Sequence, residues 1–201
     1  MRKVMLSILV FVVVLSMAAL IWAQAQGQRG QAQGRGAPYQ GKPMPGKLSG
    51  TFAVYSGVEL ETVLRQTGGD TPLKVVDTPS GNYGAYVLTY QPRAAQPGAP
   101  VNGTYHSEVG EIYYVINGSG TALLGGELKN ATENDPASNV VKTVTGPSAG
   151  GAMEGATAVR FQPGTIFFVP PGVPHQAGYD ILTKTDYLII RTDPKKTIQP
   201  H

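Results

Sequence analysis

Two histidines stand in contexts that could serve a chemical purpose. The chain has three histidines and no cysteine, so a bound metal ion would have to be held by imidazole and carboxylate groups. His175 follows a Pro-Pro-Gly-Val-Pro turn in which Gly172 is expected to take a positive φ. Such a turn fixes the direction of the imidazole at the start of the next strand. His106 lies in a second segment with carboxylates close by, whereas His201 ends the chain.

The segment around His106 alternates as a strand does. Thr104, His106 and Glu108 fall on one face, because successive side chains of a strand point to opposite sides. A turn after Glu108 would let Glu111 open the returning strand opposite His106, so that the two side chains converge within a hairpin. Tyr113 shares the strand face of Glu111 and could line the same pocket, although core packing is the simpler role for an aromatic side chain here.

The elements that must position these residues are short strands. Glycine (26) and proline (16) make up about a fifth of the 201 residues, which argues against a helical bundle and for strands joined by many turns. One short helix is expected over 56–65, with Ser56 as its cap. Residues 125–155 carry weak signals and are expected to pass over one end of a barrel. Strands are expected over residues 73–77, 83–91, 103–108, 111–117, 120–124, 156–161, 165–169 and 185–192.

The first 25 residues are typical of a secretory signal peptide. A basic start, an apolar run from Val4 to Ala23 and an Ala23-x-Ala25 exit predict cleavage after Ala25. An uncleaved membrane anchor is the alternative, because about 20 apolar residues can also span a bilayer. The domain is expected to be exported in either case, to the periplasm or outside the cell, with no stable membrane insertion once the signal is removed.

Residues 26–48 are rich in Gln, Gly, Arg and Pro and are expected to form a disordered linker ahead of a single domain, residues 49–201. The formal charge of the whole chain is +3. All six basic residues before position 49 lie in the signal and linker, which contain no acidic residue, so 10 basic and 13 acidic residues remain for the domain. A mildly acidic domain excludes nucleic acid as a partner.

The two histidine segments resemble the motifs of the cupin superfamily, G-x5-H-x-H-x3,4-E-x6-G and G-x5-P-x-G-x2-H-x3-N. In the second motif only the final Asn departs, being replaced by Tyr179. In the first motif Thr104 stands where the family has its first histidine. The residues that match the two motifs are Gly98, His106, Glu111, Gly118, Gly164, Pro170, Gly172 and His175.

This resemblance, which covers about residues 72–192, implies an all-β fold: a double-stranded β-helix, or jelly-roll barrel, with one short N-terminal helix. It also implies a divalent first-row metal, Mn, Fe, Ni, Co or Zn, held by His106, Glu111 and His175. Glu108 could replace the ligand that is lost at Thr104, which would give two histidines and two carboxylates. The other outcome is that the metal is lost.

Three classes of function remain open. The first is a metal-dependent enzyme that acts on a small polar molecule by oxygenase-, isomerase- or lyase-type chemistry, with Glu108 or Tyr113 handling protons. The second is a non-catalytic module that binds a small molecule or a sugar. The third is a structural or storage role as a homodimer, indicated by apolar residues on both faces of 111–117. Because one fold hosts all of these, the sequence does not name the reaction.

Overall fold

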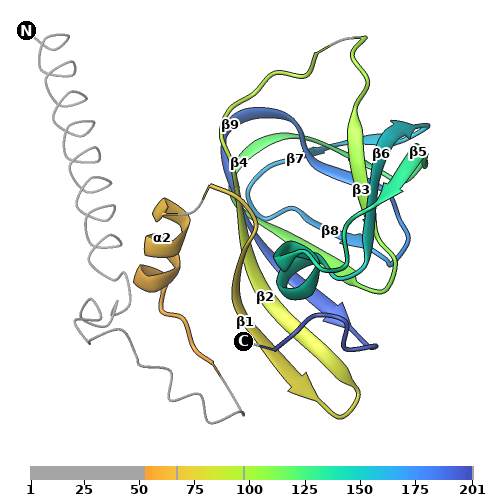
Figure 1. The fold of residues 1–201 in the computed structure, drawn as a ribbon. Helices are drawn as coiled ribbons and strands as arrows, with labels where there is room; N and C mark the ends of the chain where they lie inside the picture. The colour runs from red at the N-terminus through yellow and green to blue at the C-terminus, as the bar shows by residue number, and fades with distance from the viewer. Residues whose placement is uncertain (1–52, 67, 97, 201) are drawn as a thin grey trace, which may run out of the picture. The chain divides into compact units, whose positions relative to one another are not determined.

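The computed structural model describes residues 53–66, 68–96 and 98–200, so the predicted signal peptide and linker lie outside the described residues. Any helix within the described part of the chain is too short or too polar to cross a membrane. The elements, in chain order (Figure 1), are α2 (Gly57–Gln66), β1 (Thr71–Thr78), β2 (Gly81–Tyr90), β3 (Asn102–His106), β4 (Gly110–Leu124), β5 (Glu127–Glu133), a π-helical turn (Val141–Thr145), β6 (Ser148–Glu154), β7 (Thr157–Phe161), β8 (Ile166–Val169) and β9 (His175–Asp193).

The single α-helix begins where the sequence predicts. The Ser56 hydroxyl accepts a hydrogen bond from the Glu59 N–H at 3.3 Å, and the Ser56 N–H donates to the Glu59 carboxylate at 2.7 Å. These reciprocal bonds are a capping box, which satisfies two N–H groups that a helix start leaves free. The helix packs against β2, and Leu64 is its buried residue.

The nine strands form one continuous antiparallel sheet that is folded into two layers. One layer has the order β1-β2-β9-β4-β8, and the other has the order β5-β6-β3-β9-β4-β7. β4 and β9 occur in both layers because they are long enough, 15 and 19 residues, to run from one layer into the other. Two layers joined through shared long strands make a jelly-roll barrel, so the predicted fold class is confirmed.

The long strands bend where their pairing is irregular. The register between β4 and β9 shifts between Val115 and Gly120, and Gly118 in this stretch has a φ of +85°. A side chain there would also be blocked, because a Cβ atom would lie 2.3 Å from the Thr185 hydroxyl. Bulges bend a strand and increase its twist, which lets β4 leave one layer and enter the other.

The prediction for residues 125–155 was wrong. This segment contains two strands, and β6 pairs with both β5 and β3. β5 is largely exposed and has Thr132 as its single β-branched residue, and β6 has glycine at positions 150 and 151 and no β-branched or aromatic residue. Both segments are therefore poor in the residue types that mark a strand in a sequence. The last strand is also longer than predicted, because it begins at His175 rather than at residue 185.

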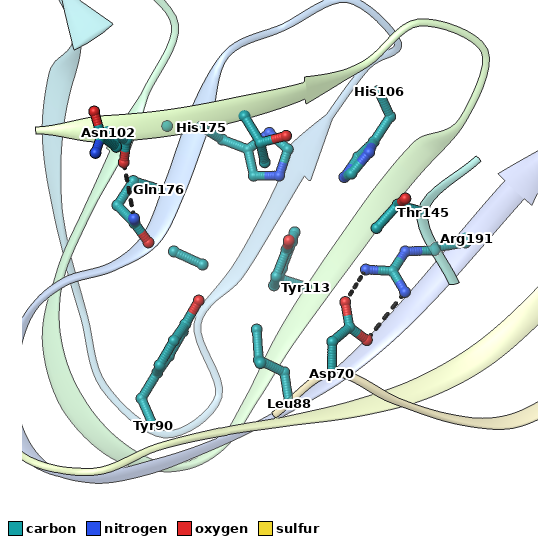
Figure 2. A pocket seen from close by; sticks show the side chains of 13 residues that line it. Asp70, Leu88, Tyr90, Asn102, His106, Tyr113, Thr145, His175, Gln176 and Arg191 are labelled. Atoms are coloured by element: carbon teal, nitrogen blue, oxygen red, sulfur yellow. Dashed lines mark hydrogen bonds and ion pairs between the residues drawn. The ribbon is translucent and has the colours of Figure 1, made fainter. Parts of the chain in front are cut away.

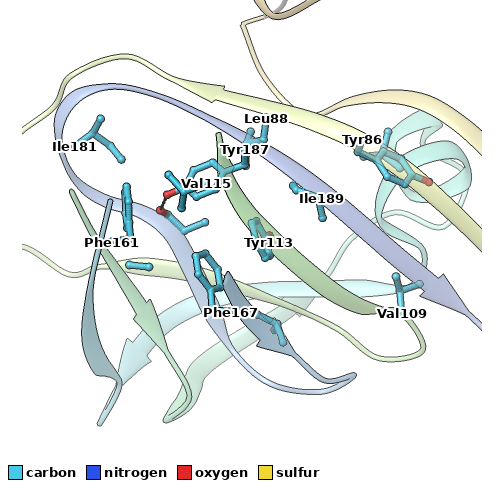
Figure 3. Close-up of a cluster of buried hydrophobic side chains, with 14 of the residues drawn as sticks. Tyr86, Leu88, Val109, Tyr113, Val115, Phe161, Phe167, Ile181, Tyr187 and Ile189 are labelled. Carbon is cyan, nitrogen blue, oxygen red and sulfur yellow. Dashed lines mark hydrogen bonds between the residues drawn. The ribbon is translucent and has the colours of Figure 1, made fainter. Parts of the chain in front are cut away.

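Aromatic side chains fill the space between the two layers (Figure 3). Tyr187 on β9 is fully buried and lies edge-on to Tyr113 and Phe161, with ring centroids 5.7 and 5.5 Å away. Tyr113 stacks on Phe167 at 4.6 Å. The Tyr187 hydroxyl donates to the Ala177 carbonyl at 2.8 Å, so the buried phenol is satisfied. Tyr113 connects this aromatic core to the residues that the sequence predicts to be functional.

Candidate metal centre

His106, Glu111 and His175 converge inside the barrel. His106 is the last residue of β3, Glu111 is the second residue of β4, and His175 is the first residue of β9. The Glu111 Oε2 atom lies 3.5 Å from Nε2 of His106 and 2.9 Å from Nε2 of His175. None of the three residues is more than 4% exposed. Of the residues that the structure describes, only these three form a group able to share one metal ion.

The strands bring them together in a way that differs from the predicted hairpin. β3 pairs with β6 and β9, whereas β4 pairs with β7, β8 and β9. His106 and Glu111 are therefore not partners across a hairpin, because the short link after β3 carries the chain to the other side of the barrel. Thr104 pairs with His175, and the Gly172 N–H donates to the His106 carbonyl at 2.7 Å. Gly172 has the expected positive φ, +79°.

The donor atoms suit a cation. The Nδ1 atom of His175 lies 3.1 Å from the Val173 carbonyl, and since a carbonyl only accepts, this nitrogen carries the proton. In the neutral ring, Nε2 then directs a lone pair at a carboxylate oxygen 2.9 Å away. Two lone pairs at this distance repel unless a cation or a proton lies between them. Two imidazole nitrogens and one carboxylate oxygen fit a divalent first-row metal.

The second carboxylate oxygen of Glu111 is held by a buried arginine. Oε1 accepts from Nε and Nη2 of Arg191 at 2.8 and 2.7 Å, and Arg191 is only 2% exposed. Burial alone raises the pKa of Glu111, but the Arg191 guanidinium, together with His106 and His175 when a proton on Nε2 joins them to the carboxylate, outweighs it and holds this pKa well below its usual value. Glu111 is therefore ionised over the whole physiological range of pH.

This lowered pKa predicts a loss of stability in acid. A carboxylate with a depressed folded-state pKa stabilises the fold above its unfolded-state pKa, about 4.3, and the contribution disappears as the pH falls further toward the folded-state value. We expect the free energy of unfolding of the wild type, measured with urea, to drop more steeply below about pH 4.3 than that of Glu111→Gln. Parallel pH profiles for the two proteins would contradict this assignment.

The other predicted residues separate into two groups. Glu108 is not brought into the cluster, since its carboxylate pairs with Lys195 at 2.8 Å and its side chain is 30% exposed; the structure gives no support to a fourth ligand at this position. Thr104 lines the central cavity and its hydroxyl donates to the Ala149 carbonyl at 3.0 Å. Tyr113 also lines the cavity, and its hydroxyl donates to Oε2 of Glu111 at 3.0 Å.

A cavity of about 330 Å³ opens beside the two histidines (Figure 2). Several of its residues are not defining positions of either motif: Asp70, Leu88, Tyr90, Asn102, Thr145, Gln176 and Arg191. The sequence pattern indicates one of these residues, Arg191. Tyr187, Ile189 and Arg191 alternate along one strand, so strand parity places Arg191 on the same inward face as the two apolar residues. Asp70 and Tyr90 carry no such signal.

No protein-family model matches the chain, and no curated protein sequence matches it. Similar solved structures include a protein from Bacillus halodurans, at 12% identity over 76% of this chain and 91% of that one, with a TM-score of 0.43. A double-stranded β-helix protein from Klebsiella pneumoniae is 13% identical over 74% of this chain and 96% of that one (TM-score 0.39). A cupin-2 domain protein from Shewanella frigidimarina is 12% identical over 71% and 95% of the two chains (TM-score 0.36). Its strand order and the two long strands shared between the layers give this chain a double-stranded β-helix, or jelly-roll, fold, in which His106, Glu111 and His175 meet.

Proposed function

We propose that the protein is an exported metal-binding cupin-domain protein that acts on a small polar molecule. The observation that supports this is the meeting of two imidazole nitrogens and one carboxylate oxygen in a buried cluster, beside a cavity of about 330 Å³. His106, Glu111 and His175 would hold a divalent first-row metal. When bound, the metal would act as a Lewis acid toward a carbonyl or hydroxyl oxygen of the substrate.

The chain's own residues would orient the substrate and handle protons. The Tyr90 hydroxyl has no hydrogen-bond partner among the described residues, and it faces the cavity (Figure 2). Burial raises the pKa of Tyr90, so at neutral pH the hydroxyl is protonated and available to donate. Tyr113 is the candidate for proton transfer at the metal side, because its hydroxyl contacts Glu111. Glu108 faces Lys195 instead and is not proposed for this role.

Export is part of the proposal and rests on the sequence of residues 1–25. The mature protein would begin at Gln26 and act in the periplasm or outside the cell. The mass of the exported species tests this directly. A full-length mass in the membrane fraction would instead support the N-terminal anchor.

A non-catalytic binding module is the second candidate. The observation that favours it is the Arg191 guanidinium on Glu111, which offsets the negative charge that attracts a metal. The cavity, which Tyr90, Asn102 and Gln176 line together with apolar residues, would then capture a small molecule or a sugar without metal. Binding of a small molecule by a metal-free protein would select this candidate.

Elemental analysis tests the metal directly. The mature wild type, purified without an affinity tag, is expected to contain one metal ion per chain. Glu111→Ala and His175→Ala should lose it, because each removes one of three ligands. Glu108→Ala is the matched control and should keep it, since Glu108 lies outside the cluster. Metal near zero in all four proteins would overturn the proposed metal site.

A further inference from the structure

We infer that Asp70, acting through Arg191, is a positioning residue of the metal centre and leaves Glu111 a single oxygen with which to bind metal. The inference rests on the proposed metal function and extends it to a residue outside both motifs. Asp70 lies just before β1, 121 residues from Arg191 in the sequence.

The Arg191 guanidinium joins two carboxylates. Its Nε–Nη2 edge donates to Oε1 of Glu111 at 2.8 and 2.7 Å. Its other edge forms a two-pronged pair with Asp70, Nη1 to Oδ1 at 3.0 Å and Nη2 to Oδ2 at 2.5 Å, which Figure 2 shows. Paired contacts of this kind fix the orientation of a guanidinium as well as its position. Arg191 therefore cannot approach Glu111 more closely without leaving Asp70.

A third contact holds the guanidinium plane. Arg191 Cζ lies 4.3 Å from the centre of the Tyr86 ring, and Tyr86 is fully buried in β2. Cation–π contact on one face and carboxylates on two edges leave the guanidinium little freedom to move. The Arg191 guanidinium thus keeps Oε1 of Glu111 away from the two imidazoles.

The geometry determines how Glu111 can bind a metal. Oε1 already accepts two N–H groups, whereas Oε2 faces Nε2 of both His106 and His175. A metal shared with the imidazoles would contact Oε2 alone, so Glu111 would be a monodentate ligand. Glu111 itself does not line the cavity, but Asp70 and Arg191 do, so a bound molecule would meet the two residues that hold the ligand.

The negative charge of Asp70 has a second effect, on the affinity of the site for a cation. Asp70 and Glu111 together carry two negative charges against the single positive charge of Arg191. If Asp70 were neutral, Glu111 alone would balance the guanidinium, and the net charge beside the metal would rise from −1 to 0. A cation would then bind more weakly. Residues that support metal ligands in this way typically change metal affinity by about 10- to 100-fold.

Asp70→Asn tests the inference, with Asp77→Asn as its matched control. Asp77 lies at the other end of β1, is exposed and pairs with Lys196 at the surface. We expect Asp70→Asn to bind Co²⁺ about 10-fold more weakly than the wild type, as measured by competition with a chromogenic chelator, and Asp77→Asn to bind it as the wild type does. The melting temperatures of the metal-free proteins show whether both variants are folded.

Arg191→Lys adds a readout that a purely structural role would not change. Lysine keeps the charge but cannot hold both carboxylates with a planar fork, so Oε1 of Glu111 becomes free to join Oε2 on the metal. We expect the visible spectrum of the Co²⁺ protein to change in Arg191→Lys and to be unchanged in Asp77→Asn. If Asp70→Asn bound Co²⁺ with wild-type affinity and Arg191→Lys gave a wild-type spectrum, the inference about Asp70 would be overturned, whereas the proposed metal site would stand. Absence of Co²⁺ binding by the wild type would overturn both it and the proposed metal site.

Discussion

Replacement of Glu111 by glutamine is expected to abolish metal binding and to lower the free energy of unfolding by about 3 kcal/mol. Glutamine keeps the shape of the side chain but removes the charge that balances the buried Arg191. Breaking a buried ion pair on one side is costly, because the remaining charge stays out of water without its partner. Asp70 still contacts Arg191, which is why we expect the lower end of the range for such pairs.

Two measurements check this prediction, with Glu108→Gln as the control. Elemental analysis gives the metal content and urea denaturation at pH 7 gives the stability. Glu108 is three residues from Glu111 in the sequence, but its side chain is partly exposed and pairs with Lys195. Exposed ion pairs contribute about 0–1 kcal/mol to stability. If the two variants lost equal stability, or if Glu111→Gln retained its metal, the role assigned to Glu111 would be wrong.

The second large effect is expected in the aromatic core. Tyr187→Ala should lower the free energy of unfolding by about 3–5 kcal/mol, as truncation of a large buried ring typically does. Tyr187 is fully buried and contacts Tyr113, Phe161 and Phe167. Its loss would leave a cavity between the two layers of the barrel. Because Tyr113 also donates to Glu111, we expect weaker metal binding as well.

Tyr187→Phe separates packing from hydrogen bonding. Phenylalanine keeps the ring and removes only the hydroxyl, which donates to the Ala177 carbonyl. A hydrogen bond of this kind contributes about 1 kcal/mol, so the Phe variant should lose far less stability than the Ala variant in the same urea experiment. Equal losses in the two variants would show that the hydroxyl, rather than the ring contacts, dominates at this position.

The sequence predicted much of the fold because most strands of the barrel have one apolar face. Alternation in the first half of β4 and the second half of β9 marks those strands directly, a run of aromatic and aliphatic residues marks β2, and the Ser56 capping box marks the start of α2. The sequence did not predict β5 and β6, because an exposed edge strand and a glycine-rich strand need no such alternation. Their place in the barrel comes from pairing with each other and with β3, a long-range contact that local patterns do not encode.

For the site, the resemblance of two sequence segments to the cupin motifs implied the three ligand candidates, and turn chemistry predicted the turn that aims His175. Turn chemistry is a local property and can be identified from the sequence, whereas strand parity placed His106 and Glu111 in a hairpin that the structure does not form. The tertiary structure alone decided that Glu108 turns to Lys195, that His106 and Glu111 meet without a hairpin, and that Arg191 ties Glu111 to Asp70. The physical reason is that these contacts form only when the barrel closes and brings together residues as far apart as positions 70 and 191.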